Sequence, residues 1–142
     1  MSVGEGAEPG GGTEITPAGW PRGVGYAHGV SARGRVVTVA GQVGWEPRTG
    51  EWIARDLPEQ TAQTLRNIAA VLEAAHCSVH DVVRLTWFVL DRDAYAAARR
   101  EIGDAYRSVF GRHYPAMSVV VVAALIEPEA LVEIEATAVV PE

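Results

Sequence analysis

Lysine is absent from this chain of 142 residues, in which all 12 basic residues are arginines. The absence excludes every mechanism that forms a Schiff base on a lysine, including pyridoxal-phosphate chemistry. It also excludes the Walker type of phosphate-binding loop, which uses a lysine. A GC-rich genome explains the bias towards arginine as well as a functional role does.

Cysteine is nearly absent, and the histidines are scattered. Cys77 is the only cysteine, so an intramolecular disulfide and a cysteine-based metal cluster are both excluded. Neither an HxH nor an HExxH spacing occurs among the histidines, which are His28, His76, His80 and His113. We therefore expect no metal and no other cofactor.

Long apolar runs are missing as well. The longest, Met117–Ile126, contains Ser118 and is shorter than the ~20 residues that a helix needs to cross a bilayer. The N-terminus has no basic segment followed by an apolar core, which a signal peptide would show. We expect no membrane contact and a cytoplasmic location.

The composition is that of one globular domain. Hydrophobic residues make up 48% and charged residues 21%, and the net charge is −6. A negative charge disfavours binding to a phosphate backbone, so no nucleic-acid partner is expected. Residues 1–19 are rich in glycine and are predicted to form a flexible tail. The folded domain is predicted to cover residues 20–142.

The first half of the domain predicts two strands and a helix. Val36–Ala40 is rich in β-branched residues and predicts a strand. Arg33-Gly34, which precedes this strand, suits a tight turn. Tyr26–Ser31 is therefore predicted to form a β-hairpin with Val36–Ala40. Pro58 is expected in the first turn of a helix. The apolar face of this helix is Leu65, Ile68, Ala69, Leu72 and Ala75.

The second half predicts three strands and one helix. Strands are predicted over Val82–Leu90 and Leu131–Val140. The continuous apolar run Val119–Leu125 predicts a third strand, buried on both faces. A helix is expected to start after Asp91 or Asp93 and to end at Gly111. Its core face is Tyr95, Ala98, Ile102, Ala105, Tyr106 and Val109.

The predicted order is β-β-α-β-α-β-β, which is an α+β fold with two helices on one face of a mixed sheet. Two helices cover only one face. Because the run Val119–Leu125 predicts burial on both faces, the other face needs a cover, and a second copy of the chain is the simplest one. The sequence thus predicts a homo-oligomer.

Candidate catalytic residues lie on the last strand. Glu133 and Glu135 are two residues apart, so they share the sheet face that the helices leave open. A carboxylate there suits a general base or a residue that orients water. Ion pairs with arginines across an interface are the alternative. His28 is a titratable candidate, and Trp45, Trp52 and Trp87 either line a pocket or pack in the core.

A series of short motifs, in this order along the chain, resembles the RidA/YjgF family, also called the endoribonuclease L-PSP family. The resemblance covers Gly25 to Val140. The motifs are Gly25–Val30, Val39–Val43, Pro47–Glu51, Thr86–Val89, Tyr114–Ser118 and Val132–Ala136.

The resemblance implies a chorismate-mutase-like fold and a homotrimer with a ligand pocket at each subunit interface. Members of the family hydrolyse reactive enamines and imines, such as 2-aminoacrylate, to keto acids and ammonia. They use an arginine to bind the substrate carboxylate, a tyrosine and a serine on the pocket wall, and a glutamate to position water.

Two of these four positions match. The tyrosine falls on Tyr26 and the glutamate on Glu133, but the serine falls on Ala40 and the arginine on Met117. Loss of a bidentate arginine–carboxylate pair costs about 100-fold or more in binding. The pocket floor is therefore expected to be more apolar than in the standard deaminases.

The remaining candidates are substrate-binding residues. Arg112 and His113, just before Met117, are candidates for a replacement cation. The family's motifs also contain Phe88 and Tyr114, which we assign with Trp45 and Trp87 to the pocket wall.

The function predicted from these residues is hydrolysis or tautomerisation of an imine- or enamine-like metabolite, with a preference shifted from the standard 2-imino acids. Glu133 is expected to position water or move a proton, and Tyr26 and His28 to hydrogen-bond the developing charge. The alternative is a trimeric ligand-binding protein without turnover. The family's older name suggests a ribonuclease, against which the negative charge and the missing lysines count.

Overall fold

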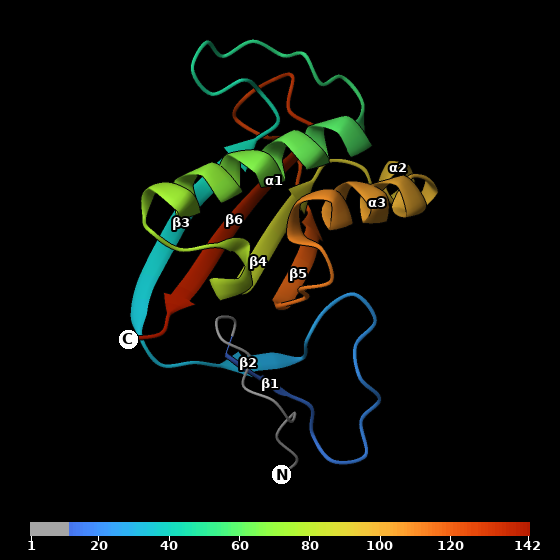
Figure 1. Cartoon of the computed structure of the whole chain (residues 1–142). Coiled ribbons are helices and arrows are strands. Elements are labelled where there is room, and N and C mark those ends of the chain that lie inside the picture. Colours follow the sequence, from blue (N-terminus) through green and yellow to red (C-terminus); the bar gives the residue numbers. More distant parts are fainter. Residues whose placement is uncertain (1–11) are drawn as a thin grey trace.

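The computed structural model of the chain describes residues 12–142 (Figure 1). The part of the predicted tail before residue 12 lies outside this range. The strands are β1 Thr13–Ile15, β2 Gly29–Ser31, β3 Arg35–Val43, β4 Val82–Val89, β5 Ala116–Val121 and β6 Val132–Val140. The helices are α1 Leu57–Ala74, the short 3-10 helix η1 Val79–Asp81, α2 Arg92–Ala97 and α3 Arg99–Phe110.

The main sheet has four strands in the order β3-β6-β4-β5, with β4 and β5 parallel and the other pairs antiparallel. Helices α1 and α3 lie together on one face of it (Figure 1). The α+β class and the one-sided helix layer are therefore confirmed. No helix in residues 12–142 is both long and apolar enough to cross a membrane.

The core lies between α1, α3 and the sheet. Leu65, Ile68 and Leu72 of α1 are fully buried, as the helical spacing predicts. The helix begins at Leu57, one residue before Pro58, because the Asp56 side chain accepts a hydrogen bond from the Glu59 backbone N–H at 2.8 Å. In β6 the helix-facing residues, which are buried, are Val132, Ile134, Ala136 and Ala138. Full burial of each large aliphatic side chain contributes ~1.5–3 kcal/mol.

The predicted hairpin is wrong. Gly29–Ser31 pairs with Thr13–Ile15, which the sequence had placed in the flexible tail, and β3 pairs with β6 instead. The reason is that β3 forms more backbone hydrogen bonds with a longer partner strand. β6 has nine residues, whereas β2 has only three. The turn residue Gly34 (φ 145°) lies so close to Val140 that an added Cβ would sit 1.9 Å from the Val140 carbonyl oxygen.

The bounds and the burial of the fifth strand differ from the prediction. It runs from Ala116 to Val121 rather than from Val119 to Leu125, and it forms one edge of the sheet. Val119, Val120 and Val121 are 39%, 40% and 55% exposed. A continuous apolar run predicts burial but does not reveal which strand lies at an edge.

The single helix predicted after Asp91 is two helices. Asp91 caps α2, and Ala98 (φ −99°, ψ 12°) ends α2 and begins α3. Gly111 ends α3 at φ 60°, a value that favours glycine, as expected for the residue after the last turn. Tyr106 and Ile102 on the core face are buried.

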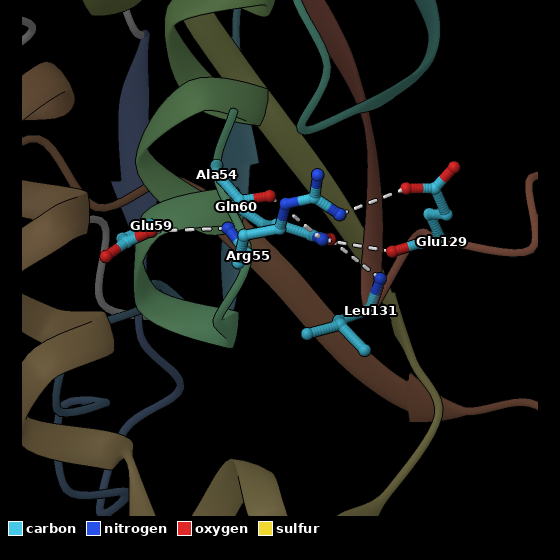
Figure 2. Close-up of polar contacts among 6 residues, drawn as sticks. All are labelled: Ala54, Arg55, Glu59, Gln60, Glu129 and Leu131. Atoms are coloured by element: carbon cyan, nitrogen blue, oxygen red, sulfur yellow. Dashed lines mark hydrogen bonds and ion pairs between the residues drawn. The ribbon is translucent and has the colours of Figure 1, made fainter. Parts of the chain in front are cut away.

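One buried amide fixes two distant loops to α1 (Figure 2). Gln60, only 2% exposed, donates from Nε2 to the Glu129 carbonyl oxygen at 3.0 Å and accepts at Oε1 from the Leu131 backbone N–H at 2.8 Å. A weaker contact, 3.5 Å, reaches the carbonyl oxygen of Ala54. Because Leu131 directly precedes β6, this amide helps to set where that strand begins.

Candidate functional site

A cavity of about 830 Å³ in the described residues lies beside α3 on the helix-bearing side of the sheet. Four of the predicted substrate-binding residues line it, namely Trp87, Arg112, Tyr114 and Met117, and Tyr26 lines it too. Its other lining residues are Val24, Gly25, Tyr95, Arg99, Ile102, Gly103, Tyr106, Arg107 and Val119.

Tyr26 is held at the cavity by the segment between β1 and β2. The next residue, Ala27, is buried and bridges to Ala116 at the start of β5, with its N–H donating to the Pro115 carbonyl oxygen at 3.0 Å. Gly23 packs closely under Tyr26, since an added Cβ there would lie 2.4 Å from the Tyr26 carbonyl oxygen and 2.7 Å from its ring. The phenol is thus positioned by its own loop and by β5.

Three aromatic rings form one wall of the cavity. Tyr106 stacks on Trp87 at 6.1 Å and on Tyr114 at 5.4 Å between ring centroids. The Tyr106 hydroxyl donates to the His113 carbonyl oxygen at 2.6 Å, and burial raises the pKa of Tyr106 above its ordinary value. This phenol therefore stays protonated and serves to fix the wall rather than to exchange protons.

The wall also holds a buried donor without a partner. The indole nitrogen Nε1 of Trp87 is buried and finds no hydrogen-bond partner in residues 12–142. Trp87 as a whole is 3% exposed, and Met117 lies on the neighbouring strand facing the same cavity. A buried N–H without an acceptor costs free energy.

Two arginines of α3 were missed by sequence reasoning. Arg99 and Arg107 line the cavity together with Arg112, which follows the helix. A spacing of four residues places Arg99, Gly103 and Arg107 on one helix face. This spacing was the sequence signal from which the two arginines could have been identified. Hydrogen bonds with Tyr114 and then Asp104 raise the pKa of Arg107, so it remains a cation.

His28 lies behind Tyr26 and is not among the residues that line the cavity. Its ring makes edge contacts with Tyr26 at 5.3 Å and with Trp20 at 5.2 Å. Nε2 lies 2.9 Å from the Pro21 carbonyl oxygen, which only accepts, so Nε2 carries the proton. The contacts suit a residue that positions Tyr26.

Glu133, Ala40 and Phe88 gather on the opposite, open face of the sheet. Glu133 alternates with the buried residues of β6, and Phe88 is its partner in the register of β4. The carboxylate lies over Gly41, where an added Cβ would meet Oε2 at 2.2 Å. A bulge in β3 between Val39 and Gln42 contains both Ala40 and Gly41, so Ala40 is the chain neighbour of the glycine that this carboxylate covers.

Trp45 and His113, like His28, lie neither at the cavity nor beside Glu133. Trp45 pairs with Trp52 at 5.8 Å in the segment between β3 and α1. His113 lies beside His80 at 5.7 Å, with its Nε2 2.7 Å from the Val82 carbonyl oxygen. Burial, the largest cause, lowers the pKa of His113 below its usual value of 6.5, and the nearby His80 lowers it further.

The site residues therefore form two groups separated by the sheet. We call the cavity beside α3, with Tyr26 and Met117, the cavity group. Glu133, Ala40 and Phe88 on the open face are the carboxylate group. Within one chain the sheet lies between Tyr26 and Glu133, so a reaction that uses both needs a second copy of the chain.

Comparison with known proteins gives consistent results. The profile of the Endoribonuclease L-PSP family matches residues 21–140. A 2-iminobutanoate/2-iminopropanoate deaminase of Salmonella typhimurium is 38% identical over 117 residues, which are 80% of this chain and 86% of that protein.

Solved structures of proteins from the same family also resemble this chain. A Rid-family protein of unknown function from Yersinia pestis is 38% identical, with a TM-score of 0.75 over 89% of this chain and 97% of that one. The TdcF protein of Escherichia coli, solved with bound serine, is 32% identical, with a TM-score of 0.65 over 99% of this chain and 100% of that one.

Proposed function

Since this chain belongs to the endoribonuclease L-PSP family, which includes the RidA/YjgF deaminases, we propose that it hydrolyses an imine-like metabolite in a pocket between the subunits of a homotrimer. In this arrangement the cavity group of one subunit meets the carboxylate group of the next. The reaction releases a carbonyl compound and ammonia.

The proposal rests on one observation, that the candidate site residues of a single chain lie on two opposite faces of the main sheet. Tyr26 and Glu133, the two retained family residues, lie on opposite faces of one chain. The open face that carries Glu133 has no helix over it (Figure 1), and Val120, the register partner of Phe88, is 40% exposed there. A neighbouring subunit packed there would cover both features and complete the site.

The chemistry follows from the side chains. The Glu133 carboxylate orients a water molecule and accepts its proton while the oxygen bonds to the imine carbon. Glu133 passes that proton to the imine nitrogen, which gives a carbinolamine. The proton of its hydroxyl group then moves to the nitrogen as the C–N bond breaks, so ammonia leaves and the C=O bond forms. The Tyr26 hydroxyl, 38% exposed as a residue in the single chain, donates a hydrogen bond to the charge that develops.

Met117 shifts the substrate preference. It is half-buried and lies on β5 in the register position beside Leu85, facing the aromatic wall. A thioether adapts its shape to apolar groups but does not hold a carboxylate. The enzyme is therefore proposed to prefer imines with bulky apolar side chains over those from alanine.

The test is an imine-hydrolysis assay. An amino-acid oxidase generates imines from alanine, leucine and phenylalanine, and semicarbazide traps what survives. Wild type is expected to accelerate hydrolysis most for phenylalanine. Glu133→Gln should lower kcat by about 100-fold or more. Glu135→Gln, the matched control two residues along the same face, should keep the wild-type rate.

The second candidate is a trimeric binding protein without turnover, favoured by Ala40 and Met117 at the positions of the family's serine and arginine. Met117→Arg separates the two. Wild-type acceleration with any imine supports the enzyme. If only Met117→Arg accelerates hydrolysis, the natural protein does not turn imines over. The natural protein would then be a binding protein whose fold supports deaminase activity only after the arginine is restored.

A further inference from the structure

The α3 side of the cavity carries guanidinium groups and no carboxylates. Arg99, Arg107 and Arg112 line it, and none of the described lining residues is Asp or Glu. The chain as a whole carries a net charge of −6. This wall is thus a local concentration of positive charge on an acidic protein, which is the pattern expected of an anion site.

These charges are only partly neutralised within the chain. Arg107 pairs with Asp104 at 2.7 Å. In residues 12–142 neither Arg99 nor Arg112 makes a side-chain hydrogen bond or an ion pair. Guanidinium groups around one cavity repel each other, and an anion bound among them removes that repulsion.

The rest of the cavity suits an aromatic or bulky apolar body. The stacked rings of Trp87, Tyr106 and Tyr114 face it, with Met117 beside them. The cavity thus combines an apolar wall and a cationic wall.

We propose that Arg99, Arg107 and Arg112 bind the acid group of an aromatic carboxylate, the task that Met117 is unable to perform. The inference rests on the proposed function only in treating this cavity as the place where the substrate body lies. It assigns the substrate class as a carboxylate whose apolar part packs on the ring wall.

A carboxylate fits better than a phosphate. The planar fork of one guanidinium matches the two oxygens of a carboxylate. The carboxyl end of α3, at Phe110 and Gly111, lies in the sequence between Arg107 and Arg112. The carbonyl groups at a helix C-terminus carry partial negative charge, which disfavours a doubly charged phosphate more than a singly charged carboxylate.

The test measures binding without turnover, by titration calorimetry with phenylacetate, its uncharged analogue phenylacetamide and phenyl phosphate. The proteins are wild type, Arg99→Gln, Arg112→Gln and the matched control Arg100→Gln. Arg100 is exposed, adjacent on α3 and not among the cavity-lining residues. Thermal melts of each variant check that the fold is intact.

Wild type should bind phenylacetate about tenfold more tightly than phenylacetamide, because charge-assisted hydrogen bonds form only with the acid. Arg99→Gln and Arg112→Gln should each weaken phenylacetate binding about threefold to tenfold, leaving the amide unchanged. Arg100→Gln should match wild type. Equal affinity for acid and amide, or an equal loss in Arg100→Gln, would overturn the proposal, and tighter binding of phenyl phosphate would overturn the carboxylate class.

The outcome separates this inference from the proposed function. If the arginine variants lose phenylacetate affinity while wild type hydrolyses no imine, the anion site stands and the enzyme assignment fails. In an active enzyme, Arg99→Gln should raise KM for the phenylalanine imine with little change in kcat, as expected for a contact made equally in ground and transition states. An unchanged KM would refute the anion site and leave the deaminase intact.

Discussion

Two inactive variants should restore each other's activity when they assemble together. In one chain the sheet separates Tyr26 from Glu133. In the proposed homotrimer, each complete site takes its cavity group from one subunit and its carboxylate group from the next. Tyr26→Phe and Glu133→Gln each damage only one of the two groups, and each variant alone should lose about 100-fold in kcat.

The expected recovery follows from the geometry. In a random mixture of equal amounts, a site is intact when its cavity subunit is Glu133→Gln and its carboxylate subunit is Tyr26→Phe. Each condition holds with a probability of one half in a cyclic oligomer, so about one quarter of the wild-type activity should return. That is about 25 times the residual activity expected of either variant alone.

The assay is co-expression of the two variants with different tags, purification through both tags, and measurement of imine hydrolysis. Purification through both tags enriches mixed oligomers, which keeps the recovery at or above the random value. The control pairs Tyr26→Phe with the double variant Tyr26→Phe/Glu133→Gln, a mixture in which no site is intact. Mixed oligomers that stay at the residual rate would refute a shared site.

Three further predictions concern the framework. Gln60→Leu removes the partners of the Leu131 N–H and of the loop carbonyls, and should lower the free energy of unfolding by roughly 2–3 kcal/mol in urea titrations; an unchanged midpoint would show that water replaces the amide. His113 has a pKa lowered from 6.5, so the unfolded chain takes up the proton first. Stability should be fully present above about pH 6.5 and fall as the pH drops below it, with a smaller fall in His113→Gln; equal falls in both proteins would exclude His113 as the cause. Gly23→Ala places a methyl group against Tyr26 and should lower kcat about tenfold or more through misplacement of the phenol, with a small change in melting temperature; full activity would show that the loop adapts.

Local patterns predicted the elements that bear the site. The strict alternation in Val132–Ala138 placed Glu133 on the face away from the helices, because a strand has a period of two and its buried residues must all point to one side. The apolar spacing of Leu65, Ile68 and Leu72 likewise fixed the inner face of α1. Both signals depend only on residues close together in the chain.

Strand pairing could not be predicted in the same way. Whether Gly29–Ser31 pairs with β3 or with β1 depends on ladders formed with residues distant in the sequence. The exposure of Val119–Val121 depends on β5 lying at a sheet edge. The arginines Arg99 and Arg107 gain meaning only once β5 and the Tyr26 segment place a cavity next to their helix face.

The open edge at β5 has a consequence for the unassembled chain. Ala116–Val121 contains no charged residue and no proline, and beyond the bridge from Ala27 to Ala116 its outer side pairs with no strand of the described chain. Such an edge offers unpaired backbone groups to any extended segment and invites aggregation. A single chain with this edge exposed is therefore prone to aggregate with other copies of itself. In the proposed homotrimer, a subunit packed over β5 would remove an edge at which chains aggregate, whatever it contributes to catalysis.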